Sequence, residues 1–357
     1  MAMRRVVIGV AVCGLCQAAA LVLAQPTVID PGQGRVSLSS GATAAAELSG
    51  ITHVGGSTYH AVGDNGAKTI WTLSVGIDPL TGWIGSSAVT GGIAAAGLGT
   101  DSEGIAYRAA TGTVFVSDEV ASTIREFSLS TGSLVGSVSV PAIYAAGNVQ
   151  SNMGLESLAF GAGGLWTANE EALVPDGPLA TTTAGSWVRI QRFDQSLTAS
   201  GQWGYRTDPI TSLNSFISAE RSGVVDILPW TATELLVLER ELGGAVVPQF
   251  RSRLYLVDTA TGSDVAALST IAAGGFTPLA KSLLWERSFG FTNFEGMTYG
   301  PTLADGARSL VLISDNGGGL NQDLYALAVV PEPSLAMFSA AVGGAVWLFG
   351  RRRSPLP

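Results

Sequence analysis

Charged residues are scarce in this sequence. They make up 13% of its 357 residues, which is about half the share found in an average soluble protein. Only two of them are lysines, Lys68 and Lys281, and the formal net charge is −9. Binding to a nucleic-acid backbone requires clustered Lys and Arg side chains. The composition therefore excludes nucleic acid as a partner.

Thiols and imidazoles are equally rare. The cysteines are Cys13 and Cys16, and the histidines are His53 and His60. Once the N-terminal segment is removed, as argued next, no thiol remains for a disulfide, a thiolate metal site or a nucleophile. The sequence also lacks Gly-x-Ser-x-Gly, His-Glu-x-x-His, Walker and dinucleotide motifs. Serine-hydrolase, zinc-protease and nucleotide chemistry are therefore disfavoured.

The N-terminus has the pattern of a secretory signal peptide over residues 1–24. Arg4 and Arg5 precede an apolar run from Val6 to Leu23, and Ala24 places a small residue at the cleavage position. This order predicts export and cleavage by signal peptidase. A membrane anchor is the alternative.

The C-terminus ends in three successive elements. Pro331-Glu332-Pro333 is followed by an apolar stretch from Ser334 to Phe349, and then by Arg351-Arg352-Arg353. This tail, residues 331–357, resembles the PEP-CTERM sorting signal of Gram-negative bacteria. The resemblance implies transient anchoring in the inner membrane, recognition by an exosortase, and delivery to the cell surface or the extracellular matrix. The alternative is a plain C-terminal anchor.

The segment between the two ends, residues 26–330, has an internal repeat. A five-residue pattern recurs, with its copies starting 54, 53, 70 and 69 residues apart. It consists of a polar or acidic residue, often a small residue, an aliphatic residue, a small residue, and then an aromatic residue or His. The five copies are Ser49–His53, Glu103–Tyr107, Glu156–Phe160, Asp226–Trp230 and Glu295–Tyr299. A second apolar stretch ending in acidic or amide residues follows each copy.

Each unit therefore contains three or four short strands separated by Gly-rich turns, for which the 46 glycines provide the material. A period of about 50 residues with four strands predicts an all-β fold, a β-propeller. We count five blades, and the longer third and fourth units leave room for a sixth. Residues 172–186 and 272–292 are predicted insertions. Stacked β-sandwich domains are the weaker alternative.

The last unit lacks a fourth strand. Its third strand ends at Val330, after which the apolar tail begins. An N-terminal strand, at Val28 or at Arg35–Ser39, is predicted to supply the missing one and to close the ring without an exposed edge.

The repeat also predicts where the acids lie. The first strand of a blade begins, and the second ends, at the same end of the sheet, because adjacent strands are antiparallel. One rim of the propeller should therefore collect Glu103, Glu156, Asp226, Glu295, Asp64, Asp118, Glu119, Glu170, Glu239 and Asp315. Arg240 and Lys68 are too few to balance these carboxylates.

Crowded carboxylates repel one another, and a bound cation would relieve that repulsion. Oxygen ligands without Cys favour Ca²⁺ or Mg²⁺ over Zn²⁺. Two other interpretations stay open. The acids accept backbone N–H bonds in turns and fasten the blades, or two of them form a metal-free catalytic pair.

The repeated stretches that begin at Ser49, Glu103, Glu156 and Asn293 resemble a phytase-like family, whose description is "esterase-like activity of phytase". The resemblance covers nearly all of residues 45–330. Asn293-Phe294-Glu295-Gly296-Met297 carries the resemblance most clearly. It implies a propeller rich in Asp and Glu with phosphoester-hydrolase activity. Ser49, Asp226 and Asn169 depart from the pattern. We predict catalytic roles for Glu103, Glu156 and Glu295, and Ca²⁺ or Mg²⁺ ligation by Asp64, Asp118, Glu170, Glu239 and Asp315.

Two functions follow from this sequence. The first is an exported, cation-dependent hydrolase of phosphorylated small molecules, with a Glu as general base. The second is a non-catalytic surface or matrix propeller whose cations stiffen the rim while other faces bind partners such as an extracellular polysaccharide.

Overall fold

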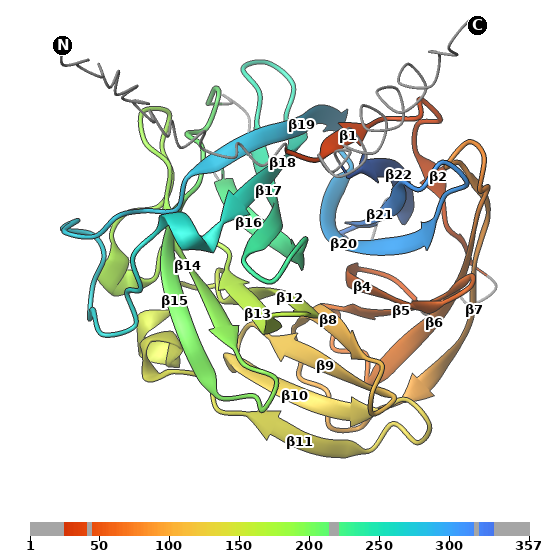
Figure 1. Cartoon of the computed structure of the whole chain (residues 1–357), viewed down its shortest axis with the longest axis horizontal. Coiled ribbons are helices and arrows are strands. Elements are labelled where there is room, and N and C mark those ends of the chain that lie inside the picture. Colours follow the sequence, from red (N-terminus) through yellow and green to blue (C-terminus); the bar gives the residue numbers. More distant parts are fainter. Residues whose placement is uncertain (1–24, 41–44, 214–220, 318–320, 332–357) are drawn as a thin grey trace, which may run out of the picture.

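The computed structural model describes residues 25–40, 45–213, 221–317 and 321–331. Within them, five β-sheets stand around a central channel like the blades of a propeller (Figure 1). The helical elements of the described residues are four short 3₁₀ turns. The all-β, five-bladed prediction is confirmed, and the described residues contain no sixth blade.

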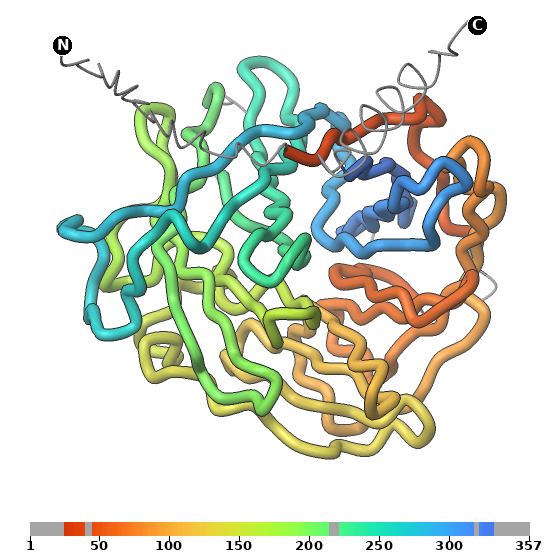
Figure 2. The backbone as a smooth tube through the Cα atoms, viewed as in Figure 1, coloured from red at the N-terminus to blue at the C-terminus, as the bar shows by residue number. Residues whose placement is uncertain are grey.

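The chain visits the blades in sequence order, as the colour gradient of the backbone tube shows (Figure 2). In each blade the first strand of the unit lies innermost, and β4, β8, β12, β16 and β20 contact one another in a closed ring. By blade, the strands are β4 (Leu48–Gly55), β5 (Thr58–Gly63), β6 (Thr69–Ile77) and β7 (Ile84–Ala94); β8 (Ser102–Arg108), β9 (Thr113–Asp118), β10 (Thr123–Ser128) and β11 (Leu134–Val138); β12 (Leu155–Gly161), β13 (Gly164–Asn169), β14 (Trp187–Phe193) and β15 (Ala199–Arg206); β16 (Arg221–Pro229), β17 (Glu234–Gly243), β18 (Gln249–Asp258) and β19 (Lys281–Gly290); and β20 (Asn293–Thr302), β21 (Arg308–Asp315) and β22 (Asp323–Val330).

The fifth blade is completed by the N-terminal segment. Two short strands, β1 (Thr27–Ile29) and β2 (Val36–Ser37), both pair antiparallel with β22. The next strand, β3 (Ser39–Ser40), pairs in parallel with β7 of the first blade. The N-terminal segment therefore joins the last blade to the first, and the predicted ring closure is confirmed at both of the proposed positions.

The core lies between adjacent blades. One apolar cluster joins Leu48 and Leu73 of the first blade to Ile313 of the fifth, and another joins Trp166 of the third blade to Val237 and Tyr255 of the fourth. Because each cluster is shared by neighbours, a blade buries its apolar face only when the ring is complete.

The two predicted insertions have different outcomes. Residues 172–186 do form an irregular connection, which includes the 3₁₀ turn Val174–Asp176 and is anchored by a fully buried ion pair between Asp176 and Arg189 at 2.6 Å. The prediction of an insertion at 272–292 is wrong for its second half. Lys281–Gly290 is β19, the fourth strand of blade four, and the long connection lies before it.

The two predicted sorting signals lie outside the described residues, except for Pro331. Among the residues that the structure describes, no helix is long and apolar enough to cross a membrane.

Ring closure by β1 leads to a first prediction. Val28 is half-buried against the core cluster shared by blades four and five, whereas its neighbour Ile29 is 47% exposed. Val28→Asp places a charge against this core and should lower the free energy of unfolding by about 2 kcal/mol. The melting temperature should then fall by about 4–8 °C.

Ile29→Asp is the matched control, because it adds the same charge on the opposite face of the same strand. Thermal unfolding of both variants checks the prediction. Equal shifts in the two proteins would contradict closure of the ring by this strand.

Candidate metal centre at the acidic mouth

Every innermost strand contains a β-bulge. In the first blade the pairing between β4 and β5 shifts between Leu48 and Gly50, so that Ser49 has no partner residue in the ladder. The same shift occurs in all five blades, although in blade two it spans two residues. A bulge bends its strand and re-aims a side chain. The bulge residues at the equivalent positions are Ser49, Glu103, Glu156, Val225 and Glu295.

The residue after the bulge is small in every blade except the fourth, which has Asp226 there, because the next blade lies against it. A Cβ atom on Gly50 would lie 2.1 Å from the carbonyl oxygen of Glu103, and one on Gly104 would lie 2.6 Å from Cβ of Leu158. Glycine at these positions is therefore required by the close approach of neighbouring innermost strands.

A second ring of side chains comes from the strand next to each innermost strand. Backbone pairing fixes its members, because the N–H groups of Asp64, Glu119 and Glu170 donate to the residue two positions before the bulge of their own blade. The pairings Gly223↔Arg240 and Asn293↔Asp315 give the same position in the remaining blades. The second ring therefore comprises Asp64, Glu119, Glu170, Arg240 and Asp315.

This register corrects the sequence alignment by one residue in three places. The bulge of blade four is Val225, not Asp226. In the second ring, Glu119 replaces the predicted Asp118, and Arg240 replaces the predicted Glu239. Because side chains alternate between the two faces of a strand, a slip of one residue turns a side chain to the other face.

The displaced acids have other partners. Glu239 accepts hydrogen bonds from Tyr205 of the third blade and from Lys281, and so it does not join the other predicted ligands. Asp118 accepts the N–H of Ala121 at 2.7 Å in a turn. Asp226 lies beside the bulge residues and accepts the N–H of Met297 at 2.6 Å, across to blade five. These three carboxylates fasten the fold, as the turn interpretation of the acids predicts.

The remaining acids meet at one mouth of the channel, which we call the acidic mouth. Oxygen atoms of Glu103, Glu119 and Glu156 all lie within 4.8 Å of one another, and so do oxygens of Asp64, Asp101 and Glu103. The Ser49 hydroxyl donates to Glu103 and lies 3.4 Å from Glu295. The three glutamates predicted as catalytic are therefore brought together.

Arginine enters this cluster from blade four. The Arg240 guanidinium lies 2.5 Å from Glu170 of blade three and 3.2 Å from Glu295 of blade five. Arg221, the first residue of β16, also lies 3.4 Å from Glu170. Lys68, the other cation expected nearby, donates instead to the carbonyl oxygens of Leu98 and Gly99.

The carboxylates outnumber these two arginines, and the pKa values of the glutamates are raised. Burial raises the pKa of Glu103 and Glu156 well above the usual range, and neighbouring glutamates raise both further. Burial and the nearby Glu170 raise the pKa of Glu119 to about 8. Burial raises the pKa of Glu295 to about 7 despite the opposing effect of Arg240.

One carboxylate oxygen points to a missing ligand. Oε1 of Glu119 accepts the N–H of Gly154 at 2.7 Å, whereas the buried Oε2 has no donor group beside it among the described residues and can pair only with the Asp101 carboxyl, when one of the two is protonated. The carboxylate of Glu156 accepts no hydrogen bond from the described part of the chain, and its neighbours are the carboxylates of Glu103 and Glu119. Unpaired buried acceptors are costly, and a cation satisfies several at once. The acidic mouth therefore has the donors to hold an ion.

Three members of the mouth were missed from the sequence. Asp101 stands two residues before the bulge residue Glu103, as Glu47 stands before Ser49, and this third column could have revealed it. Glu171 and Arg221 belong to no repeated column. Burial raises the pKa of Glu171 to about 7.

Comparison with known proteins gives one family match. Residues 43–318 match the model of the family described as "Phytase-like: Esterase-like activity of phytase". No curated protein matches the chain. Among solved structures, the PQQ-bound aldose sugar dehydrogenase of Streptomyces coelicolor is 12% identical with a TM-score of 0.37, covering 83% of this chain and 98% of that one. A protein from Lactobacillus plantarum is 10% identical with a TM-score of 0.39, covering 86% and 100%. Hydrazine synthase of Kuenenia stuttgartiensis is 11% identical with a TM-score of 0.36, covering 82% of this chain and 66% of that one.

The raised pKa values predict how stability depends on pH in the absence of metal. The folded protein keeps protons on Glu119, Glu295 and Asp64 up to about pH 7–8, whereas the unfolded chain releases them near pH 4.5 for the glutamates and near pH 3.8 for Asp64. The unfolded state therefore binds fewer protons in this window, and stability falls as pH rises from about 4.5 to 8.

Melting temperatures in EDTA, measured from pH 5 to 8, check this prediction. Glu119→Gln should flatten the decline, and the difference between variant and parent removes the contribution of His60, whose pKa is lowered by burial. A variant with the same pH slope as the parent would contradict the assignment.

Proposed function

The chain belongs to the phytase-like family, and from that premise we propose that its acidic mouth binds a divalent cation and hydrolyses phosphoesters. The observation that carries the proposal is the triad of Glu103, Glu119 and Glu156. Their carboxylate oxygens converge within 4.8 Å, all three side chains are buried, and the second oxygen of Glu119 has only the Asp101 carboxyl as a partner among the described residues.

The donor set favours Ca²⁺ over other cations. Carboxylate oxygens are hard ligands, and Ca²⁺ accepts six to eight of them in irregular geometry, whereas Mg²⁺ demands a near-ideal octahedron. Glu103, Glu119 and Glu156 would hold the ion. Glu103 is shared with the second group, Asp64 and Asp101, so a second ion would bind next to the first.

Ser49 and Arg240 set the orientation of the carboxylates. The Ser49 hydroxyl donates to Glu103, and one guanidinium nitrogen of Arg240 forms ion pairs with both Glu170 and Glu295. Because these partners occupy some lone pairs, the remaining oxygens are presented to the channel. A preorganised acceptor set of this kind is what ion binding and proton transfer both require.

Glu156 is suited to act as general base. Its carboxylate lies beside Glu103 and accepts no hydrogen bond from the described residues, so the oxygen that does not bind the ion would take a proton from an attacking water. That water would lie on the outer side of the acidic mouth, because the pocket between the bulge residues has no water-sized space. Glu103 and Glu295 share the role of positioning that water. A cation, when bound, would neutralise phosphate charge and lower the pKa of bound water.

The substrate class follows from the charge of the site. A phosphorylated small molecule cannot approach this many carboxylates unless a cation intervenes. Hydrolysis should therefore depend strictly on the cation. The proposal also includes export, with removal of residues 1–24 by signal peptidase and of the 331–357 tail by an exosortase, leaving the propeller at the cell surface or in the matrix.

Calcium titration of the metal-stripped protein tests the cation site. Glu119→Gln removes one ligand charge, and its side-chain amide still accepts the Gly154 N–H. We expect calorimetry to show at least a tenfold loss of Ca²⁺ affinity. Glu126→Gln is the matched control, because Glu126 is buried and accepts a hydrogen bond from Thr113 outside the mouth. Equal affinities in the two variants would exclude this site.

Phosphate release from p-nitrophenyl phosphate and inositol hexakisphosphate tests the chemistry. We expect activity that EDTA abolishes and Ca²⁺ restores, and about a hundredfold loss of kcat in Glu156→Gln, the effect of removing a general base. Ca²⁺ binding that raises the melting temperature without any phosphate release would instead support the non-catalytic scaffold function.

A further inference from the structure

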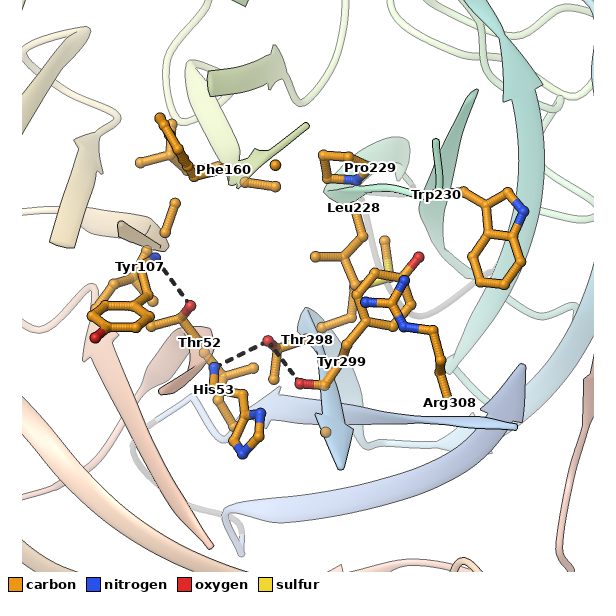
Figure 3. Close-up of a pocket in the computed structure, with 18 of the residues that line it drawn as sticks. Thr52, His53, Tyr107, Phe160, Leu228, Pro229, Trp230, Thr298, Tyr299 and Arg308 are labelled. Atoms are coloured by element: carbon orange, nitrogen blue, oxygen red, sulfur yellow. Dashed lines mark hydrogen bonds between the residues drawn. The ribbon is translucent and has the colours of Figure 1, made fainter. Parts of the chain in front are cut away.

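The opposite end of the channel is lined by side chains that contain rings, whereas the acidic mouth is lined by carboxylates. All five innermost strands run from the acidic mouth to this end, so residues four positions after each bulge meet there. These residues are His53, Tyr107, Phe160, Pro229 and Tyr299. We call this end the aromatic mouth, and Figure 3 shows its side chains around an open centre. The repeat predicts the ring positions, except that in blade four Pro229 takes the place expected for Trp230.

The aromatic mouth contains a cavity of about 400 Å³, within the size range of small-molecule sites. Its lining includes the five ring residues, Trp230 and Arg308, and no Asp or Glu among the described residues. The channel between the two mouths narrows at the bulge residues until no water-sized space remains. The two mouths are therefore separate sites with different charge.

Arg308 gives the cavity its positive charge. Its guanidinium lies 3.5 Å from the centre of the Tyr299 ring and 5.8 Å from that of Trp230, and the three side chains lie together in Figure 3. In the described part of the chain, the Arg308 side chain has neither an ion pair nor a hydrogen bond. The hydroxyl of Tyr299 is also buried without a hydrogen-bond partner there. That hydroxyl is enclosed by protein, so the Arg308 guanidinium is the group left to pair with the anionic part of a ligand.

The strands that carry the ring side chains are held in place by hydrogen bonds between neighbouring blades. The N–H of Tyr107 donates to the Thr52 hydroxyl at 3.1 Å, and the N–H of His53 donates to the Thr298 hydroxyl at 3.1 Å (Figure 3). Nε2 of His53 lies 3.0 Å from the carbonyl oxygen of Gly56. The cavity is therefore preformed, which lowers the entropy cost of binding.

From this geometry we propose that the aromatic mouth binds an acidic sugar, the uronate unit of an acidic polysaccharide. The flat rings offer apolar surfaces to the C–H faces of a pyranose. The stacked guanidinium presents parallel N–H groups that match a planar carboxylate. One arginine balances one carboxylate, whereas a multiply charged phosphoester would leave most of its charge unpaired.

The test uses calorimetry with the full chain, 1 mM EDTA, and two matched probes. These are the trisaccharide of galacturonic acid and its methyl ester, which has the same shape without charge. We expect the acid to bind at least tenfold more tightly than the ester. Arg308→Gln should weaken binding of the acid by about ten- to hundredfold, the effect of a charge-assisted hydrogen bond, and Arg308→Lys should recover part of it.

Arg206→Gln is the matched control, because Arg206 stacks on Trp187 at 4.9 Å outside this cavity. It should leave the affinity for the trisaccharide unchanged. Melting temperatures establish that the variants are folded. If Arg308→Gln does not fold, Arg308→Met replaces it and should weaken binding of the acid by a similar factor, because it removes the charge and keeps an apolar contact with the Tyr299 ring.

A spectroscopic readout places the ligand. The acid trisaccharide should change tryptophan fluorescence in the parent protein and not in Trp230→Phe. Equal binding of acid and ester, unchanged affinity in folded Arg308→Gln, or the absence of binding at millimolar trisaccharide would each overturn the proposal. Competition by inositol hexakisphosphate but not by galacturonate would overturn it as well.

Discussion

The β-bulge in each innermost strand is the constraint on which both mouths of the channel depend. It leaves one side chain of each blade outside the ladder and directs it into the centre, where Glu103, Glu156 and Glu295 meet. Four residues later the same strands bring five rings together at the other end. One backbone irregularity, repeated five times, therefore positions a cluster of acids and a cluster of rings on a single channel.

Blade four breaks the symmetry of the acidic mouth. Val225 and Arg240 occupy the two positions that carry acids in most other blades. The arginine contacts glutamates of blades three and five, while Glu103, Glu119 and Glu156 of blades two and three form no ion pair with the residues that the structure describes. The charge imbalance is thus local, and a metal ion would bind on the side of the mouth away from blade four. The opposite mouth, with Arg308 and no lining carboxylate among the described residues, has the reverse preference.

The repeat was sufficient to predict the five blades, the closure by the N-terminal strand and the meeting of three glutamates, because each depends on spacing. The position of individual ligands depends on register, which spacing does not fix to one residue. In blade four the acid Asp226 matched the pattern better than Val225, although Val225 is the bulge residue. Likewise Asp118 and Glu239 looked equivalent to Asp64, but one further residue in the strand turns the neighbouring Glu119 and Arg240 into the channel. Arg221 and Arg308 come from outside the first column, and only the folded blades bring them to the two mouths.

The central claim is that the buried carboxylates of the acidic mouth exist to hold a cation. A crystal structure of the protein grown with millimolar Ca²⁺, with anomalous scattering recorded to identify the ion, tests it most directly. The account predicts a peak between Glu103, Glu119 and Glu156, with Ca²⁺–oxygen distances of about 2.3–2.6 Å. An acidic mouth that contains only water under these conditions would contradict it.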